Sequence, residues 1–331
     1  MTGARVLLTG ATGFIGSTVL DALSGAREGG ADALSSGTHE GGAAGVAVTA
    51  AVRTPPTDRA PLPGVRWARA DLTDPASLRG LGDGCDVLLH LAARVGGDAR
   101  TCAAVNVDGT AALLEEARRA GIGRVVLLST AAVYGAGPHS GIAVDEIAPE
   151  PVSDASRTRL AAERLVLAAG GTVLRPGLVL GTGDRWVVPA LAELVRRVPA
   201  RWDGGRGLLS VVDVHDLARL IATLARAARL PGGTHHASHP EPVRVGDLLT
   251  ALAGYGVLPE PPARDWPMGR CLAELAGTPG RVSERQFRLL AEDHWYDSGE
   301  IWRLAGCVPG AGPTAGLADA APWYRSLLAG K

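Results

Sequence analysis

The stretch Arg5-Val6-Leu7-Leu8-Thr9-Gly10-Ala11-Thr12-Gly13-Phe14-Ile15-Gly16 decides the fold of this chain. A short apolar run ends in three glycines spaced three residues apart, and an apolar segment compatible with a helix continues to Leu23. This order predicts a strand, a tight turn and a helix whose first turn faces a phosphate. Gly10 permits the turn, Gly13 lets the backbone approach a ligand, and Gly16 lets the helix pack closely on the strand.

The start of this helix favours an anion, because its first N–H groups have no partner within the helix. We therefore expect the diphosphate of a dinucleotide to bind at six residues: Gly10, Thr12, Gly13, Phe14, Ile15 and Gly16. A glycine turn with a purely structural role is the alternative, but the strand before it and the helix after it favour the dinucleotide.

Length and composition limit the class of protein. A chain of 331 residues can bury a large core, and one large domain with a smaller lobe is the natural division. The formal net charge of −1 gives no basic surplus for nucleic acid or an anionic membrane. We see no secretory signal and no apolar run long enough to span a membrane. Four scattered cysteines suit a reducing cytoplasm and predict no structural metal site.

Lysine and tyrosine are scarce. Lys331, the last residue, is the only lysine, so any mechanism that needs an internal lysine is excluded. The chain has four tyrosines: Tyr134, Tyr255, Tyr296 and Tyr324.

The residue that reads the ribose is expected at the end of the second strand, Val46 to Val52. Residues 24–45 are rich in Gly, Ala and Ser and predict a long, mobile loop before that strand. The strand ends in Arg53 and has no acidic residue there. An arginine suits a 2′-phosphate, whereas a carboxylate would repel it, so we expect NADPH or NADP+ as the cofactor. A solvated charge at the strand end is the alternative role for Arg53.

Strands and helices alternate through the first half of the chain. Further strands are expected at Val65–Ala70, Val87–Leu91, Arg124–Leu128 and Thr172–Leu174, and a helix at Ser156–Ala168. Alternation with short loops predicts an α/β fold, a Rossmann-like, doubly wound parallel sheet. We expect residues 1–177 to form the dinucleotide-binding domain. Residues 178–331 are expected to form mainly a substrate lobe, with some segments returning to the first domain.

The motif TGATGFIG, with its 3-3 glycine spacing, resembles the extended short-chain dehydrogenase/reductase family. The resemblance implies that Asp71 accepts a hydrogen bond from the adenine amino group, and a cap for the helix near Pro75 is its alternative role. It also implies that Leu72 binds the cofactor and that the backbone of Leu91, Ala92 and Ala93 touches it. It also implies that Pro176 lies in the turn against the nicotinamide. Thr130 lies four residues before Tyr134, where the family has its catalytic serine or threonine, and we expect it to assist catalysis.

The chain departs from this family at the catalytic pair, a tyrosine four residues before a lysine. Aligning residues 158–163 with the family's SKLAAE places Ala155 at the tyrosine and Arg159 at the lysine. Ala155 has no proton to donate. Arg159 can supply charge and ribose contacts, but it cannot shuttle a proton near neutral pH. Losing a positioned general acid costs roughly 10²–10⁴ in rate.

Three functions remain open. The first is reduction of a ketone flanked by a phenol, whose own hydrogen bond can replace the missing acid. The second is a regulator that binds NADP(H) without chemistry. The third is a nucleotide-sugar epimerase or dehydratase, which depends most directly on the missing tyrosine.

As a whole, the chain resembles the atypical ketoreductases of angucyclinone antibiotic biosynthesis, of the simocyclinone type. The resemblance implies a small aromatic polyketide as the substrate and leaves the oligomeric state open. The histidines between Thr234 and Pro240 predict an ordinary strand rather than a metal site, because His235 and His239 lie about 13 Å apart in an extended chain. His215 is expected mainly to begin a helix, and whether it contacts the substrate stays open.

Overall fold

The computed structural model describes residues 3–25, 46–57 and 60–330. The chain divides into two compact units: residues 1–129, 153–174 and 218–234 form the first, and residues 130–152, 175–217 and 235–331 form the second. The units interleave along the chain: residues 130–152 belong to the second unit, and residues 218–234 return to the first. Apart from Ser24 and Gly25, the expected loop 24–45 lies outside the described residues.

A seven-stranded sheet organises the first unit, and its order is β12-β7-β5-β4-β1-β2-β3. Every pair from β3 to β7 is parallel. The predicted doubly wound sheet is therefore confirmed, and the chain reverses its direction of winding between β1 and β4. The strands are β1 (Arg5–Thr9), β2 (Ala47–Val52), β3 (Val65–Arg69), β4 (Val87–His90), β5 (Arg124–Leu128), β7 (Thr172–Arg175) and β12 (Gly233–His236).

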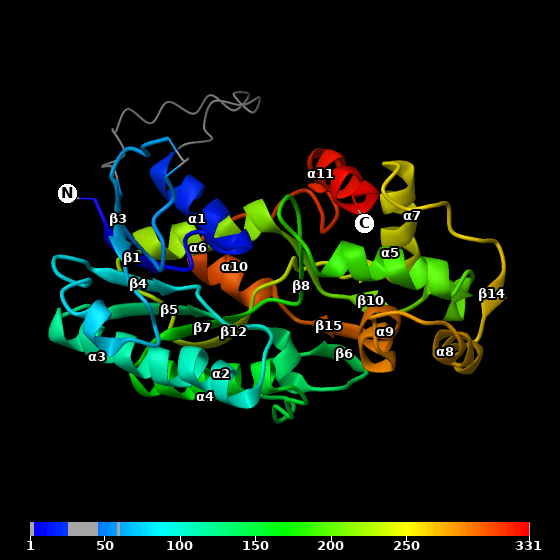
Figure 1. Ribbon diagram of the computed structural model, residues 1–331, viewed down its shortest axis with the longest axis horizontal. Coiled ribbons are helices and arrows are strands. Elements are labelled where there is room, and N and C mark those ends of the chain that lie inside the picture. The colour runs from blue at the N-terminus through cyan, green and yellow to red at the C-terminus, as the bar shows by residue number, and fades with distance from the viewer. Residues whose placement is uncertain (1–2, 26–45, 58–59, 331) are drawn as a thin grey trace. The chain divides into compact units, whose positions relative to one another are not determined.

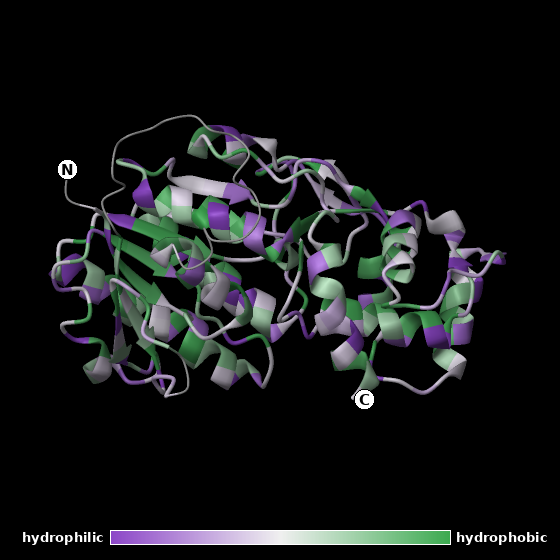
Figure 2. Ribbon diagram, turned by 90° about the horizontal axis from the view of Figure 1, so that it is seen from above, coloured by the Kyte–Doolittle hydropathy of each residue, from purple (hydrophilic) through white to green (hydrophobic). Residues whose placement is uncertain are grey.

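The central strands are apolar because the sheet is covered on both faces. All four residues of β4 are buried, and so are the last four of β5. Figure 2 shows the strands of this sheet mostly in the green of hydrophobic residues. One core cluster of this unit joins Leu7 and Leu88 to Leu113 and Val166.

Helices cover the sheet as Figure 1 shows, with α1 and α6 on one face and α3 and α4 on the other. The Arg226 side chain of α6 donates to the carbonyl of Ala22 at the end of α1, which ties these two helices together. A π-helical turn, Ala104–Asp108, directly precedes α3. The helices are α1 (Phe14–Ser24), α2 (Ala99–Ala103), α3 (Gly109–Arg119), α4 (Asp154–Ala168) and α6 (Val214–Arg226), with a short 3₁₀ turn at Pro75–Leu78.

The second unit combines short strands with a group of helices. Its four-stranded sheet has the order β13-β10-β15-β6, and two further pairs are β11-β8 and β14-β9. The strands are β6 (His139–Ile142), β8 (Leu178–Leu180), β9 (Arg201–Trp202), β10 (Leu208–Leu209), β11 (Val211–Asp213), β13 (Val243–Arg244), β14 (Asp265–Trp266) and β15 (His294–Tyr296). The helices are α5 (Val187–Arg197), α7 (Val245–Gly254), α8 (Met268–Gly277), α9 (Glu284–Ala291), α10 (Gly299–Ala305) and α11 (Leu317–Ala329), with 3₁₀ turns at Ala131–Tyr134 and Asp203–Gly205.

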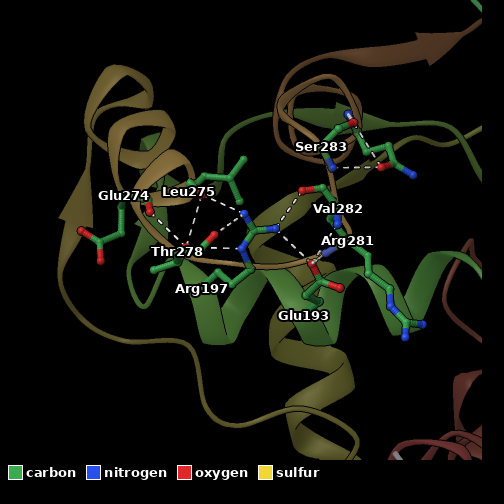
Figure 3. Close-up of polar contacts among 9 residues, drawn as sticks. Glu193, Arg197, Glu274, Leu275, Thr278, Arg281, Val282 and Ser283 are labelled. Carbon is green, nitrogen blue, oxygen red and sulfur yellow. Dashed lines mark hydrogen bonds and ion pairs between the residues drawn. The ribbon is translucent and has the colours of Figure 1, made fainter.

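Arg197 holds the helices of the second unit together at its buried guanidinium (Figure 3). The group donates to Glu193 on its own helix and to the carbonyl of Leu275 in α8. It also donates to the carbonyls of Thr278, directly after α8, and of Val282, before α9. Its side chain is only 11% exposed. A planar group with five donors satisfies several chain ends at once, which a lysine could not do.

Within the described ranges, no helix combines the length and the apolar character needed to cross a bilayer.

Candidate cofactor site

The glycine loop after β1 lies against the backbone that follows β4. Gly10 has a φ of +77°, and a β-carbon there would lie only 2.7 Å from the backbone nitrogen of Ala92. The loop therefore leaves no room for a side chain at Gly10. Because β1 and β4 are the strands at which the winding reverses, their carboxyl ends form the crevice where such sheets bind ligands.

The start of α1 is left open. Gly13 is its N-cap residue, no side chain caps the helix, and the first turn contains no acidic residue. The N–H of Gly13 donates to the carbonyl of Gly10 at 2.9 Å, which fixes the turn. The first-turn N–H groups of Phe14, Ile15 and Gly16 are thus available to an anion. This arrangement fits the diphosphate of a dinucleotide.

A cleft of about 440 Å³ in the first unit contains most of the predicted cofactor residues. Phe14, Ile15 and Gly16 do not line it and contribute the first turn of α1 instead. Three lining residues that the sequence did not single out are Arg94, Thr101 and Val105. The predicted residues that line the cleft are Gly10, Thr12, Gly13, Arg53, Asp71, Leu72, Leu91, Ala92 and Ala93.

Asp71 is held as a carboxylate at the end of β3. One of its oxygens accepts hydrogen bonds from the backbone N–H of Thr73 at 2.9 Å and from the Thr73 hydroxyl at 2.7 Å. These bonds lower the pKa of Asp71, and the nearby charge of Arg53 lowers it further. The second oxygen accepts no hydrogen bond from another described residue, so it is available to an amino group of a ligand.

His90 is a neutral bridge inside this unit. Its Nδ1 lies 2.8 Å from the Thr9 hydroxyl, and its Nε2 lies 2.9 Å from the Thr110 hydroxyl. The Thr110 hydroxyl donates to the carbonyl of Asn106 and must therefore accept from Nε2, so Nδ1 accepts from Thr9. Burial lowers the pKa of His90 to about 4. We infer that His90 fixes the strand ends rather than moving a proton.

Asn106, in the π-helical turn, ties the segment after β4 to α4. Its side-chain oxygen accepts from the N–H of Arg94 at 2.7 Å, and its nitrogen donates to the Arg94 carbonyl and to the Thr158 hydroxyl. Turns of this kind are frequent at functional sites. The partners Arg94 and Thr158 lie 12 and 52 residues away in the sequence, so no local spacing shows that the Asn106 amide joins two elements.

The first turn of α4 contains Ala155. Ser153 caps this helix through a capping box with Ser156, so α4 begins two residues before the expected Ser156. Alanine at this position offers no proton, as the sequence predicts.

One turn further along α4, Arg159 donates to the carbonyl of Leu128 at 2.8 Å. Burial lowers the pKa of Arg159 to about 10, although the charge of Glu163 raises it, and the group therefore keeps its proton at neutral pH. Glu163 is fully buried and accepts a short hydrogen bond from Ser129. Arg159 and Ser129 both border a cavity of about 10 Å³, which is room for at most one water molecule.

Thr130 lines a small cavity of about 70 Å³ in the second unit. Its hydroxyl accepts from the N–H of Ala132 and caps the turn that follows. Ser210 and His294 border the same cavity, but Ser210 bonds to the Tyr296 backbone and His294 lies 3.0 Å from the carbonyl of Ala136. Pro176 is buried in this unit, and its carbonyl accepts from the N–H of Ala131.

All four tyrosines lie in the second unit, and the hydroxyl groups of three of them form hydrogen bonds with other side chains. His236 donates from Nδ1 to the carbonyl of Asp297, so its Nε2 accepts the proton of Tyr134 at 2.7 Å. The Tyr296 hydroxyl bonds to His139, and the Tyr324 hydroxyl bonds to Asp184. The fourth, Tyr255, is exposed at the end of α7.

The histidines between residues 234 and 240 each have a protein partner. His235 lies 3.3 Å from Glu300, and His239 lies 3.1 Å from the carbonyl of Gly310. His215 is in the first turn of α6, where its N–H donates to Asp213. Across the described ranges, no three histidine, cysteine or acidic side chains gather at a metal-binding distance.

Residues 6–236 match the NAD dependent epimerase/dehydratase family. The match spans more than half of the chain, so this protein belongs to that family of nicotinamide-dependent enzymes, the extended short-chain dehydrogenase/reductases. The parallel seven-stranded sheet agrees with this family, and the uncapped start of α1 would fit the diphosphate of a nicotinamide dinucleotide.

Two relatives are reductases. A 4-hydroxy-2-methyl-3-oxo-4-farnesyl-3,4-dihydroquinoline-1-oxide ketoreductase from Stigmatella aurantiaca is 32% identical over 261 residues, which are 75% of this chain and 72% of the relative. A 2-alkyl-3-oxoalkanoate reductase from Stenotrophomonas maltophilia is 30% identical over 292 residues, covering 77% of this chain and 85% of the relative. Family and relatives together indicate an oxidoreductase.

The fold is shared with solved structures of low identity. MoeE5 in complex with UDP-glucuronic acid and NAD is 24% identical and has a TM-score of 0.69, and the match covers 98% of this chain and 99% of that protein. At this identity the likeness supports the architecture alone.

Proposed function

We propose that this protein is an NADPH-dependent ketoreductase that reduces a carbonyl of an aromatic polyketide of the angucyclinone type in antibiotic biosynthesis. The proton for the new hydroxyl group comes from the substrate. The observation that carries this proposal is Ala155, which stands where the family has its acid, in a chain that keeps the cofactor cleft.

The cofactor supplies a hydride when it is bound. The residues of this chain would hold it in place: the first turn of α1 would bind the diphosphate, Asp71 the adenine and Arg53 the 2′-phosphate. Arg159 keeps a positive charge at the position of the family's lysine and is oriented by the Leu128 carbonyl. None of these groups is suited to release a proton at neutral pH.

We assign the proton to the substrate because the buried tyrosines of this chain are not placed to donate one. Tyr134, Tyr296 and Tyr324 have buried hydroxyls that bond to other side chains. A ketone with a neighbouring phenol already has an intramolecular hydrogen bond. As the carbonyl becomes an alkoxide, the phenol gives its proton to that oxygen, and the phenolate recovers a proton from water. Thr130 assists by donating a hydrogen bond to the same oxygen.

The substrate class is supported by the resemblance of the whole sequence to angucyclinone ketoreductases. It is also supported by the relative at 32% identity, whose name describes a ketone on a ring fused to an aromatic ring. A nucleotide-sugar epimerase or dehydratase is not favoured, because those reactions depend most directly on the tyrosine that Ala155 replaces.

The test compares two polycyclic ketones that differ only in the phenol beside the carbonyl. NADPH absorbance should fall with the hydroxylated ketone, and kcat/KM should drop at least 100-fold for the ketone without the phenol. Equal rates for the two ketones would mean that the protein provides the proton. Tight NADPH binding without turnover of any such ketone would instead support a regulator.

A further inference from the structure

Arg53 and Arg69 border the same depression on the surface of the first unit. The depression has a volume of about 720 Å³ and also contains Thr12, from the glycine loop. Arg69 is the last residue of β3 and pairs in register with Val52, the last residue of β2, and Arg53 follows directly. Adjacent strands lie about 4.8 Å apart, so two long side chains from these positions can reach one small anion.

The two guanidinium groups differ from the other arginines nearby. Arg53 and Arg69 make no hydrogen bond or ion pair with another residue that the structure describes. By contrast, Arg66 on the same strand donates to the Thr49 hydroxyl, and Arg94 donates to the carbonyl of Gly96. Both Arg53 and Arg69 are exposed, so their charges are available to a ligand.

Two carboxylates in the depression each accept hydrogen bonds from the protein with one oxygen. Asp71 accepts from Thr73, and Asp74 accepts from the N–H of Ala76 at the start of the 3₁₀ turn. Their lone pairs are partly occupied by these donors, whereas the cations have open donors. A phosphate monoester has nearly two negative charges at pH 7, and one arginine balances only about half of them.

We propose that Arg69 and Arg53 together bind the 2′-phosphate of NADP(H), so that Arg69 is a second specificity residue for the cofactor. The proposal rests on the NADPH dependence proposed above. In such sheets the ribose 2′-position points to the end of β2, and the register of β2 and β3 brings Arg69 to the same end. Each guanidinium presents a planar fork of donors that suits phosphate oxygens.

The test measures the equilibrium affinity of the purified protein for 2′,5′-ADP and for 5′-AMP, two fragments that differ only in the 2′-phosphate. The wild type should prefer 2′,5′-ADP. Arg69→Gln should weaken 2′,5′-ADP binding about tenfold and 5′-AMP binding less than twofold, and Arg53→Gln should do the same. The matched control is Arg66→Gln, which removes a charge from the same strand and should change neither affinity.

Salt provides a second readout, because contacts between exposed charges are screened. The preference for 2′,5′-ADP should shrink with rising salt in the wild type and less steeply in Arg69→Gln. If Arg69→Gln keeps the wild-type preference for 2′,5′-ADP while Arg53→Gln loses it, Arg69 has no role in this site. That result would overturn the inference about Arg69 and leave the proposed NADPH dependence standing. If the wild type itself does not distinguish the two fragments, the proposed NADPH dependence fails as well.

Discussion

A β-carbon on Gly16 would overlap the carbonyl oxygen of Gly10, so α1 packs directly on the turn that follows β1. This close approach aims the open first turn of α1 at the cleft. The contact is made by backbone on both sides, and neither partner can swing away as a long side chain could.

Gly16→Ala should therefore distort the diphosphate site. We expect the dissociation constant for NADPH to rise at least tenfold and the protein to lose about 1–3 kcal/mol of stability, because the added methyl group forces the backbone apart. Calorimetry and thermal unfolding measure these effects. The control is Gly254→Ala at the end of α7, where a β-carbon meets nothing within 4 Å, and it should leave both values unchanged or slightly improved. Normal NADPH binding by Gly16→Ala would refute this role.

Thr130→Ala tests the source of the proton. If the substrate provides it, kcat/KM for a phenol-flanked ketone should fall less than about 100-fold, because only an assisting hydrogen bond is lost. Steady-state rates at saturating NADPH give the value. A loss above about 1000-fold would mean that the protein donates the proton. His215→Ala should also lower kcat/KM by less than about 100-fold.

Arg53→Glu reverses the charge at the end of β2. The new carboxylate should repel a 2′-phosphate and accept from a free ribose hydroxyl, so the KM for NADPH should rise at least 100-fold while that for NADH changes little. Initial rates with both cofactors measure the ratio. Equal losses for the two would remove Arg53 as the residue that selects the phosphate.

His90 makes stability depend on pH. Its pKa is about 4 in the folded protein and 6.5 when exposed, so between these values only the unfolded chain takes up the proton. The contribution of neutral His90 to the free energy of unfolding is complete above about pH 6.5. It disappears as the pH falls through 4, which lowers the free energy of unfolding by roughly 3 kcal/mol. Urea unfolding across this range should show a smaller pH slope for His90→Asn than for the wild type. Identical slopes would contradict the neutral state of His90.

Arg197→Met should destabilise the second unit by about 3–5 kcal/mol, because Glu193 and three partly buried carbonyls each lose a charged donor. The matched control is Arg206→Met, which breaks an exposed pair with Asp203 and should cost less than about 1 kcal/mol. Denaturant unfolding compares the two variants. Similar losses would mean that the network in Figure 3 contributes little.

Nine residues predicted to bind the cofactor share one cleft because the features that predict them are local. The glycine spacing, the apolar strand before it and the residue at the end of β2 all act through neighbouring backbone, and whether these residues bind the cofactor stays a prediction. Arg69 was missed because nothing in its own sequence neighbourhood marks it. Only the pairing of Arg69 with Val52 places it beside the end of β2.

The sequence by itself determined the sheet, the open start of α1 and the absence of an acid at Ala155, since these depend on residue type and short-range order. The tertiary structure decided which polar groups already have a hydrogen-bond partner within the protein and which are available to a ligand. Tyr134 has a phenol, yet its proton bonds to His236, 102 residues further along the chain. Such long-range hydrogen bonds and buried charges arise only when distant segments pack together, and no local pattern of residues records them.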